Sequence, residues 1–75
     1  MNDLLDLRAL PAPEPMERVL AALDVLPDGA RLRVLLAREP HPLYGILART
    51  GYRWRSDWLT DSPTRGCLVT IARNA

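Results

Sequence analysis

Cysteine, histidine and lysine are scarce in this 75-residue sequence, and each scarcity excludes a kind of chemistry. Cys67 is the only cysteine, so an internal disulfide cannot form. His41 is the only histidine, and one cysteine with one histidine cannot supply the four ligands of a structural zinc site of the Cys/His type. All ten basic residues are arginines, which excludes Schiff-base chemistry on a lysine. We therefore expect neither a bound metal nor a cofactor.

Long apolar runs are also lacking. A membrane span needs about 20 consecutive apolar residues, and no run approaches that length. The acidic N-terminus has no basic flank of the kind that begins a signal peptide, so we expect a cytoplasmic protein without membrane contact. Hydrophobic residues at 48% and charged residues at 25% predict one globular domain over residues 1–75. A net charge of +1 is too balanced to imply nonspecific nucleic-acid binding.

The first half of the sequence predicts a strand, a helix and a second strand. Residues 4–8 alternate loosely between apolar and polar, which favours a short strand. Apolar residues recur at helical spacing after Pro13, and a Pro-Asp-Gly turn at 27–29 ends that helix. Residues 31–36 alternate again, as is typical of a strand with one buried face. The apolar stripe of the helix consists of Met16, Val19, Leu20, Leu23 and Leu26.

The second half predicts a short helix and a hairpin. A proline-framed start favours a helix over residues 42–50, and Gly51 stands where a C-terminal glycine is expected. Aromatic and charged side chains alternate in residues 52–58, and residues 61–66 supply a turn. The nearly continuous apolar run at 67–72 is typical of an interior strand.

The order β-α-β-α-β-β predicts an α/β two-layer sandwich with a four-stranded mixed sheet. Two right-handed crossovers place both helices on one face of the sheet and leave the other face open. The apolar last strand belongs inside the sheet and the arginine-rich strand at an edge, so we expect the spatial order 1-2-4-3. The predicted core comprises Leu20, Leu23, Leu32, Val34, Ile46, Leu47, Val69 and Ile71.

The stretch from Leu5 to Met16 resembles the start of the TusA-like (SirA-like) sulfur-carrier proteins. In that family a strand leads into a Cys-Pro-x-Pro motif at the first helix, and here Ala-Pro-Glu-Pro occupies residues 12–15. The likeness continues through the second strand and the second helix start, and so covers almost the whole chain. The sequence Arg-Glu-Pro-His-Pro-Leu-Tyr at 38–44 is similar to a branch of the superfamily that lacks the cysteine and has no assigned function.

The resemblance implies the same βαβαββ fold and a loss of the family's chemistry. In the sulfur carriers the motif cysteine accepts a persulfide and passes it on, and Ala12 stands at that position here. Ala9 also replaces the family's glycine before Leu10. We therefore expect a noncatalytic binding or regulatory module rather than an enzyme. Sulfur relay through Cys67 stays an alternative, although Cys67 begins the most apolar strand, where a cysteine usually behaves as a buried hydrophobe.

The two predicted helix starts form a candidate anion-binding site. Helices of parallel β-α-β units begin at the same end of the sheet, where unpaired first-turn N–H groups attract anions. The candidate residues at this rim are Arg8, Ala12, Pro13, Arg38 and His41. Acidic residues at the same helix starts, Glu14, Glu17 and Glu39, favour the alternative of a solvated rim with local ion pairs.

The open sheet face is a candidate partner-binding platform. Strand parity places four arginines on it, together with Asp6, Arg8 and Asp57, and with Leu35, Leu68 and Thr70 between the charges. Such a face suits an acidic protein or RNA, whereas arginine stems that merely cover apolar surface are the alternative. The four candidate residues are Arg31, Arg33, Arg53 and Arg55. The same parity directs Tyr52, Trp54 and Trp58 toward the helices, where they would fill the core rather than stack on bases.

These sites leave three hypotheses for function. The first is a binding or regulatory module whose partner is a protein or a small anionic ligand, and the others are a sulfur-relay protein and a small RNA-binding domain. The sequence does not define the oligomeric state.

Overall fold

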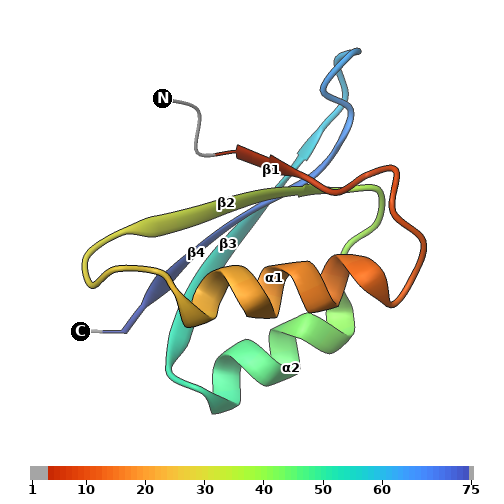
Figure 1. The fold of residues 1–75 in the computed structure, drawn as a ribbon. Helices are drawn as coiled ribbons and strands as arrows, with labels where there is room; N and C mark the ends of the chain where they lie inside the picture. Colours follow the sequence, from red (N-terminus) through yellow and green to blue (C-terminus); the bar gives the residue numbers. More distant parts are fainter. Residues whose placement is uncertain (1–3, 75) are drawn as a thin grey trace.

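Six elements follow one another in the order that the sequence predicts (Figure 1). The computed structural model describes residues 4–74. The chain forms β1 (Leu4–Asp6), α1 (Glu14–Asp24), β2 (Arg31–Leu36), α2 (His41–Arg49), β3 (Tyr52–Leu59) and β4 (Gly66–Arg73). The observed bounds differ from the predicted ones by a residue or two, as is usual at element ends.

The sheet has the predicted spatial order β1-β2-β4-β3. β1 and β2 are parallel because α1 connects them as a crossover, whereas β4 is antiparallel to both β2 and β3. Val34 of β2 is paired with Leu5 of β1 and with Val69 of β4, so apolar side chains align across three strands. The apolar β4 is therefore interior and the arginine-rich β3 is an edge strand, which confirms the predicted topology.

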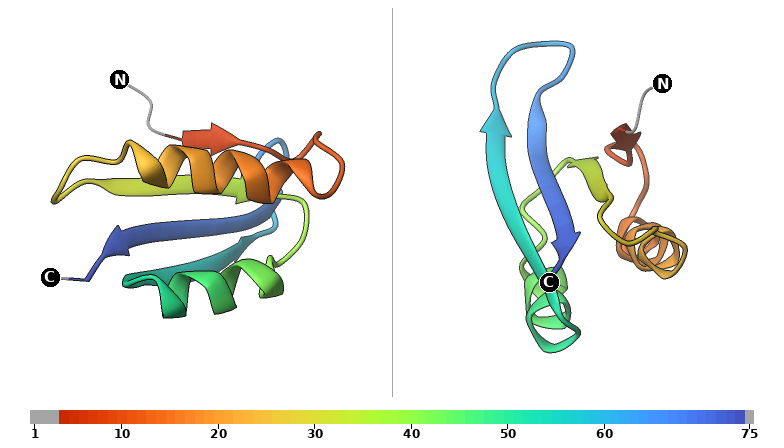
Figure 2. Two further views of the ribbon diagram at one scale, coloured as in Figure 1. Left: turned by 60° about the horizontal axis from the view of Figure 1, so that its bottom comes forward. Right: turned by 90° about the vertical axis from the view of Figure 1, so that its left-hand side faces the viewer.

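Both helices cover one face of the sheet (Figure 2). α1 packs against β2 and α2 packs against β3. Each helix has a buried apolar stripe, formed by Val19 and Leu23 in α1 and by Leu43 and Leu47 in α2. None of the helices within residues 4–74 is long and apolar enough to cross a membrane.

The core lies between the helices and the sheet. Its side chains are apolar, and no polar or charged side chain is buried among residues 4–74. Leu20 and Ile46, which the sequence assigns to the core, are only half-buried. Five residues outside the predicted core are buried there as well: Leu7, Val19, Leu36, Leu43 and Cys67. The buried cluster comprises Leu7, Val19, Leu23, Leu32, Val34, Leu36, Leu43, Leu47, Cys67, Val69 and Ile71.

The second sheet face is not open along its whole length, which corrects the prediction for Leu35. This side chain lies on the face away from the helices, yet only 1% of its surface is exposed. Gly66 beside it has a φ of +155°, and a Cβ there would come within 3.2 Å of both Leu35 and Arg8. Leu35 is therefore covered by the Arg8 side chain and by the start of β4, a long-range contact that strand periodicity does not reveal.

Trp58 also departs from expectation. Tyr52 and Trp54 pack against the core, as parity predicts, and the ring of Trp54 stacks on Tyr44 of α2 at a centroid distance of 5.1 Å. Trp58 has the same parity, but 56% of its surface is exposed. The β3–β4 hairpin extends past the helix layer, so no helix covers the far end of β3 (Figure 1).

Candidate functional site

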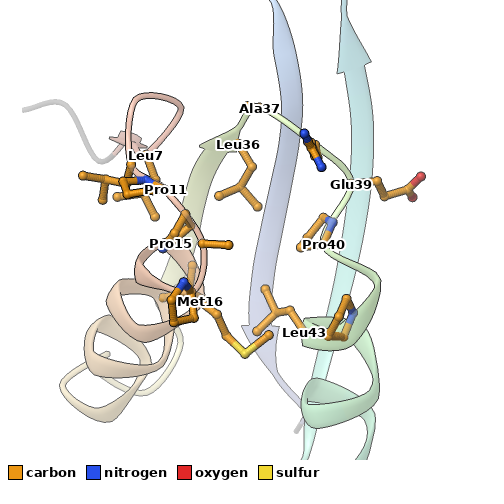
Figure 3. Close-up of a pocket in the computed structure, with 15 residues that line it drawn as sticks. Leu7, Pro11, Pro15, Met16, Leu36, Ala37, Glu39, Pro40 and Leu43 are labelled. Atoms are coloured by element: carbon orange, nitrogen blue, oxygen red, sulfur yellow. The ribbon is translucent and has the colours of Figure 1, made fainter.

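A cavity of about 540 Å³ lies between the starts of the two helices (Figure 3). Its volume is within the range of about 300–1,000 Å³ that is typical of small-molecule sites. Met16 of α1, Leu43 of α2 and Leu36 at the end of β2 point into the space (Figure 3). The lining residues are Leu7, Leu10, Pro11, Ala12, Pro13, Pro15, Met16, Val19, Leu36, Ala37, Arg38, Glu39, Pro40, Pro42 and Leu43.

Prolines stand at both helix starts that line this cavity. Pro11, Pro13 and Pro15 precede or begin α1, and Pro40 and Pro42 do the same for α2. The proline ring fixes φ and is compatible with a helical first turn, where the missing N–H would have no helical partner. The prolines thus give the cavity stiff apolar walls and remove N–H donors from its rim.

The first N–H groups of α1 are partly engaged, contrary to prediction. The Glu14 N–H donates to the Pro11 carbonyl at 2.9 Å, and the Glu17 N–H donates to the Pro13 carbonyl at 3.2 Å. Pro15 has no N–H. Little of the donor array that binds anions at other helix starts is left at this one.

The start of α2 has the same property. The Leu43 and Tyr44 N–H groups donate to the Pro40 carbonyl at 3.0 and 3.3 Å, and the His41 N–H donates to the Glu39 carbonyl at 3.1 Å. Pro42 contributes no donor. The predicted set of unpaired N–H groups at the two helix starts is therefore wrong for these residues, and the site is apolar rather than rich in donors.

The two charged residues of the lining differ in what they contact. The Glu39 carboxylate accepts a hydrogen bond from the Tyr44 hydroxyl at 3.3 Å and lies 3.8 Å from the His41 ring, and it points away from the cavity (Figure 3). Arg38 makes no ion pair within residues 4–74. The His41 side chain is 77% exposed and does not line the cavity. Arg38 is thus the free charge at the rim.

Arg8 does not join this rim. Its guanidinium donates two hydrogen bonds to the Asp6 carboxylate, from Nε to Oδ1 at 2.9 Å and from Nη2 to Oδ2 at 2.7 Å. Its Nη1 donates to the carbonyls of Pro63 and Arg65 in the β3–β4 loop. The hydrogen bonds that Arg8 donates to the Asp6 carboxylate lower the pKa of Asp6 to about 2. Of the predicted rim residues, Ala12, Pro13 and Arg38 line the cavity, whereas Arg8 and His41 do not.

The four predicted platform arginines do lie together on the exposed sheet face. Arg31 and Arg53 flank Ala72 in one cross-strand row, and Arg33 and Arg55 flank Thr70 in the next. A depression of about 260 Å³ is lined by three of them, Arg31, Arg53 and Arg55, but not by Arg33. The four side chains are exposed. We call this surface the arginine face.

Two arginines of this face contact other residues of the same chain, and the other two make no ion pair within residues 4–74. The Arg55 Nε lies 3.3 Å from the Asp57 carboxylate, and the Arg53 Nη1 donates to the Arg73 carbonyl at 2.8 Å. Arg31 and Arg33 make no ion pair with any residue that the structure describes. Their guanidinium groups are available to a partner.

Cys67 is buried, as the sequence predicts. Only 2% of its surface is exposed, and it lies between Leu36 and Trp58 in a row across β2, β4 and β3. Burial raises the pKa of its thiol above the usual value, although a hydrogen bond with Tyr44 acts in the opposite direction. No group of three or more potential metal ligands occurs within residues 4–74.

The apolar cavity is the feature that sequence reasoning missed. The sequence located the helix starts but assigned them to anions. The available signal was the set of five prolines at two helix starts next to Met16, Leu36 and Leu43, which favours stiff apolar walls over donors.

Comparison with known proteins adds a family but no function. Neither a curated protein nor a solved structure matches the chain significantly. The model of one family matches residues 4–65, from β1 to the β3–β4 loop. The chain belongs to that family, which is described as "Uncharacterized conserved protein (DUF2249)".

Proposed function

We propose that this protein is a noncatalytic, TusA-like binding module that holds a small ligand in the cavity between the two helix starts. The observation that carries the proposal is the cavity of about 540 Å³, whose walls come from both helix starts and from the end of β2. It is the type of concave, mostly apolar site in which proteins bind small molecules. Ala12, the residue at the sulfur-carrier position in the resemblance to TusA-like proteins, is part of its lining.

The lining favours a ligand with an apolar body and one anionic group. Leucine, methionine and proline side chains provide the apolar contacts. Glu39 is turned away toward Tyr44 and His41, so it does not oppose an anion in the cavity. Arg38 at the rim has no carboxylate partner within the described residues, and its planar fork matches a carboxylate. An aliphatic carboxylate has both required parts.

The absence of reactive groups from the lining supports a noncatalytic role. Ala12 offers only a methyl group, and neither Cys67 nor His41 lines the cavity. General acid–base catalysis needs a titratable side chain within hydrogen-bond reach of the reacting atom. Glu39 is the only carboxylate of the lining, and its side chain is directed away.

The test compares octanoate with octanol, which shares its chain but lacks its charge. We expect octanoate to shift the amide resonances of Ala12 and Leu43 in a saturable manner, and to bind more tightly than octanol. Arg38→Gln should remove the preference for octanoate and leave octanol binding unchanged. Arg18→Gln, which changes an exposed arginine of α1 outside the lining, is the matched control. Octanoate shifts that do not saturate, or an unchanged preference in Arg38→Gln, would reject the proposal.

The arginine face supports a second function, the binding of an acidic protein. Arg31 and Arg33 lack ion-pair partners within residues 4–74, and two further guanidiniums flank the same residues of β4. Tyr52 and Trp54 pack against the core on the helix side, so their rings do not form on this face the platform on which RNA bases stack. An acidic protein is therefore favoured over RNA. Arg31→Glu with Arg33→Glu should abolish retention on an immobilised polyglutamate column, and unchanged retention would reject this function.

Sulfur relay through Cys67 stays the least supported hypothesis. A relay thiolate must be exposed and nucleophilic, whereas Cys67 is buried and burial raises the pKa of its thiol. After incubation with a cysteine desulfurase and a sulfur source, we expect the native chain to gain no mass of one sulfur atom. Ala12→Cys places a thiol at the cavity and is the positive comparison. A persulfide on the native chain that Cys67→Ser abolishes would make sulfur relay the leading hypothesis.

A further inference from the structure

The outer edge of β3 is an unusually regular strand edge. β3 contains eight residues, has no proline, and is paired with β4 residue for residue without a bulge. Short strands, bulges and prolines are the usual devices that prevent a sheet edge from pairing with another chain. β3 has none of these, although it does carry the charged side chains that are a further such device.

The backbone groups that face outward can be assigned from the ladder. The Asn74 N–H donates to the Gly51 carbonyl at 2.9 Å, so this pair is hydrogen-bonded to the inside. Hydrogen-bonded and non-hydrogen-bonded pairs alternate along antiparallel strands. The odd-numbered residues of β3 therefore bond to β4, and the even-numbered residues direct their N–H and C=O groups away from the sheet. These residues are Tyr52, Trp54, Ser56 and Trp58.

We propose that β3 is the interface of a symmetric dimer, in which the β3 strands of two copies pair antiparallel about a two-fold axis at Ser56. Because only even-numbered residues offer outward backbone groups, they must face one another across the interface. Ser56 then faces Ser56 of the second copy, and Trp54 faces Trp58. Each such pair exchanges two backbone hydrogen bonds. The two sheets join into one, and the helices of both copies stay on the same side.

The side chains of β3 are self-complementary in this register. On the face away from the helices, Arg55 is opposite Asp57 of the second copy in a non-hydrogen-bonded pair, where side chains approach most closely. These two residues already lie 3.3 Å apart within one chain, and the pairing forms a closed cluster of two arginines and two carboxylates. Opposite charges across a strand pair are stabilising.

The same register accounts for Trp58. Its exposure of 56% is high for a large apolar side chain, because the hairpin extends past the helix layer. In the dimer it faces Trp54 of the second copy, which is stacked on Tyr44. Aromatic cross-strand pairs stabilise antiparallel sheets. An exposed tryptophan beside an unpaired edge is thereby removed from water.

Charge disfavours the neighbouring registers. The next allowed shift in one direction centres the two-fold axis on Arg55, which sets two guanidiniums against each other, although Arg53 then faces Asp57 of the second copy. The shift in the other direction centres it on Asp57 and sets two carboxylates against each other. Like charges that are directly opposite destabilise a strand pair, so the register centred on Ser56 is selected. A symmetric closed interface of this kind ends the association at two copies.

The first experiment removes the central hydrogen bonds while it preserves the monomer. In Ser56→Pro the lost N–H points outward, so the β3–β4 ladder stays intact, and proline is tolerated at such edge positions. Ser56→Ala removes the hydroxyl and keeps the N–H, which makes it the matched control. By sedimentation equilibrium we expect a dimer for the native chain and for Ser56→Ala. The dissociation constant of Ser56→Pro should be at least about tenfold higher.

The second experiment uses the charges and does not depend on proline. In Arg55→Asp two carboxylates face each other at positions 55 and 57, and in Asp57→Arg two guanidiniums do. Each variant alone should therefore be monomeric. A mixture of the two should form a heterodimer, because every facing pair is then opposite in charge. A native chain that stays monomeric up to about 1 mM, equal dimerisation of Ser56→Pro, or a mixture that fails to associate would overturn the proposal. None of these outcomes depends on whether the cavity binds a ligand.

Discussion

The two faces of the sheet are built on different principles. The face toward the helices carries only apolar side chains in its buried part, and no polar side chain is buried within residues 4–74. The opposite face carries arginines and carboxylates, and within residues 4–74 its one fully buried side chain, Leu35, is covered by Arg8. The comparison indicates that the helix-side face supplies the stability of the fold. The arginine face is then free to retain charges that folding does not require.

Removal of a core side chain should produce the largest loss. Leu47 of α2 is fully buried on the helix side. We expect Leu47→Ala to lower the free energy of unfolding by about 2–5 kcal/mol, from lost apolar burial and the cavity left behind. For so small a domain that is a large part of the total. Leu68→Ala, at a half-buried position of the opposite face, should cost less in the same urea titration. Equal losses at the two positions would refute the contrast.

Arg8→Ala should have the next largest effect, because it uncovers Leu35. The substitution removes the contacts to Asp6, Pro63 and Arg65 and leaves an apolar side chain facing water. We expect faster hydrogen exchange at the Leu7 N–H, which donates to the Leu35 carbonyl at 2.9 Å, and a smaller loss of stability than in Leu47→Ala. Arg53→Ala removes one contact to a carbonyl on the same face and is the control. Unchanged exchange in Arg8→Ala would show that Arg8 does not cover Leu35.

The Asp6–Arg8 pair should make stability depend on pH. Its contacts lower the pKa of Asp6 to about 2 in the folded chain, against about 4 when unfolded. The carboxylate therefore stabilises the fold above about pH 4, and this contribution is lost as the pH falls through about 2. Asp6→Asn should lack this part of the acid transition when thermal unfolding is followed between those values. Identical pH profiles for the native chain and the variant would contradict the assignment.

Substitutions at the unpaired arginines should have the smallest effect on the fold. Arg31 and Arg33 are exposed and have no ion-pair partner within the described residues. We expect Arg31→Glu and Arg33→Glu each to change the free energy of unfolding by no more than about 0.5 kcal/mol, as is usual at exposed sites. Urea titration measures this. A large loss would mean that these side chains serve the fold rather than a partner.

Periodicity and composition were sufficient for the topology. The apolar run now seen as β4 indicated an interior strand, and the arginines of β3 indicated an edge, which together fix the order 1-2-4-3. The features that failed depend on contacts between distant segments. Leu35 is buried because Arg8 reaches the β3–β4 loop. Trp58 is exposed because the β3–β4 hairpin extends past the helices. Alternation along a single strand contains neither fact.

The candidate site was located but its chemistry was not. The parallel crossover predicted that the two helix starts share one end of the sheet, and they do. The expectation of free N–H groups failed because carbonyls two to four residues earlier accept several of them, as the Pro40 carbonyl does from Leu43 and Tyr44. Such bonds depend on the local conformation of the proline turns, which residue types alone do not specify.

Intermolecular nuclear Overhauser effects to bound octanoate test the central claim, ligand binding at the helix starts, most directly. The octanoate methylene protons should give cross-peaks with the methyl groups of Met16, Leu36 and Leu43, which point into the cavity. The Ala12→Trp variant fills the rim with a large side chain and should lose these cross-peaks while it retains the native fold. Cross-peaks only to residues outside the cavity lining, or none at saturating octanoate, would contradict the account.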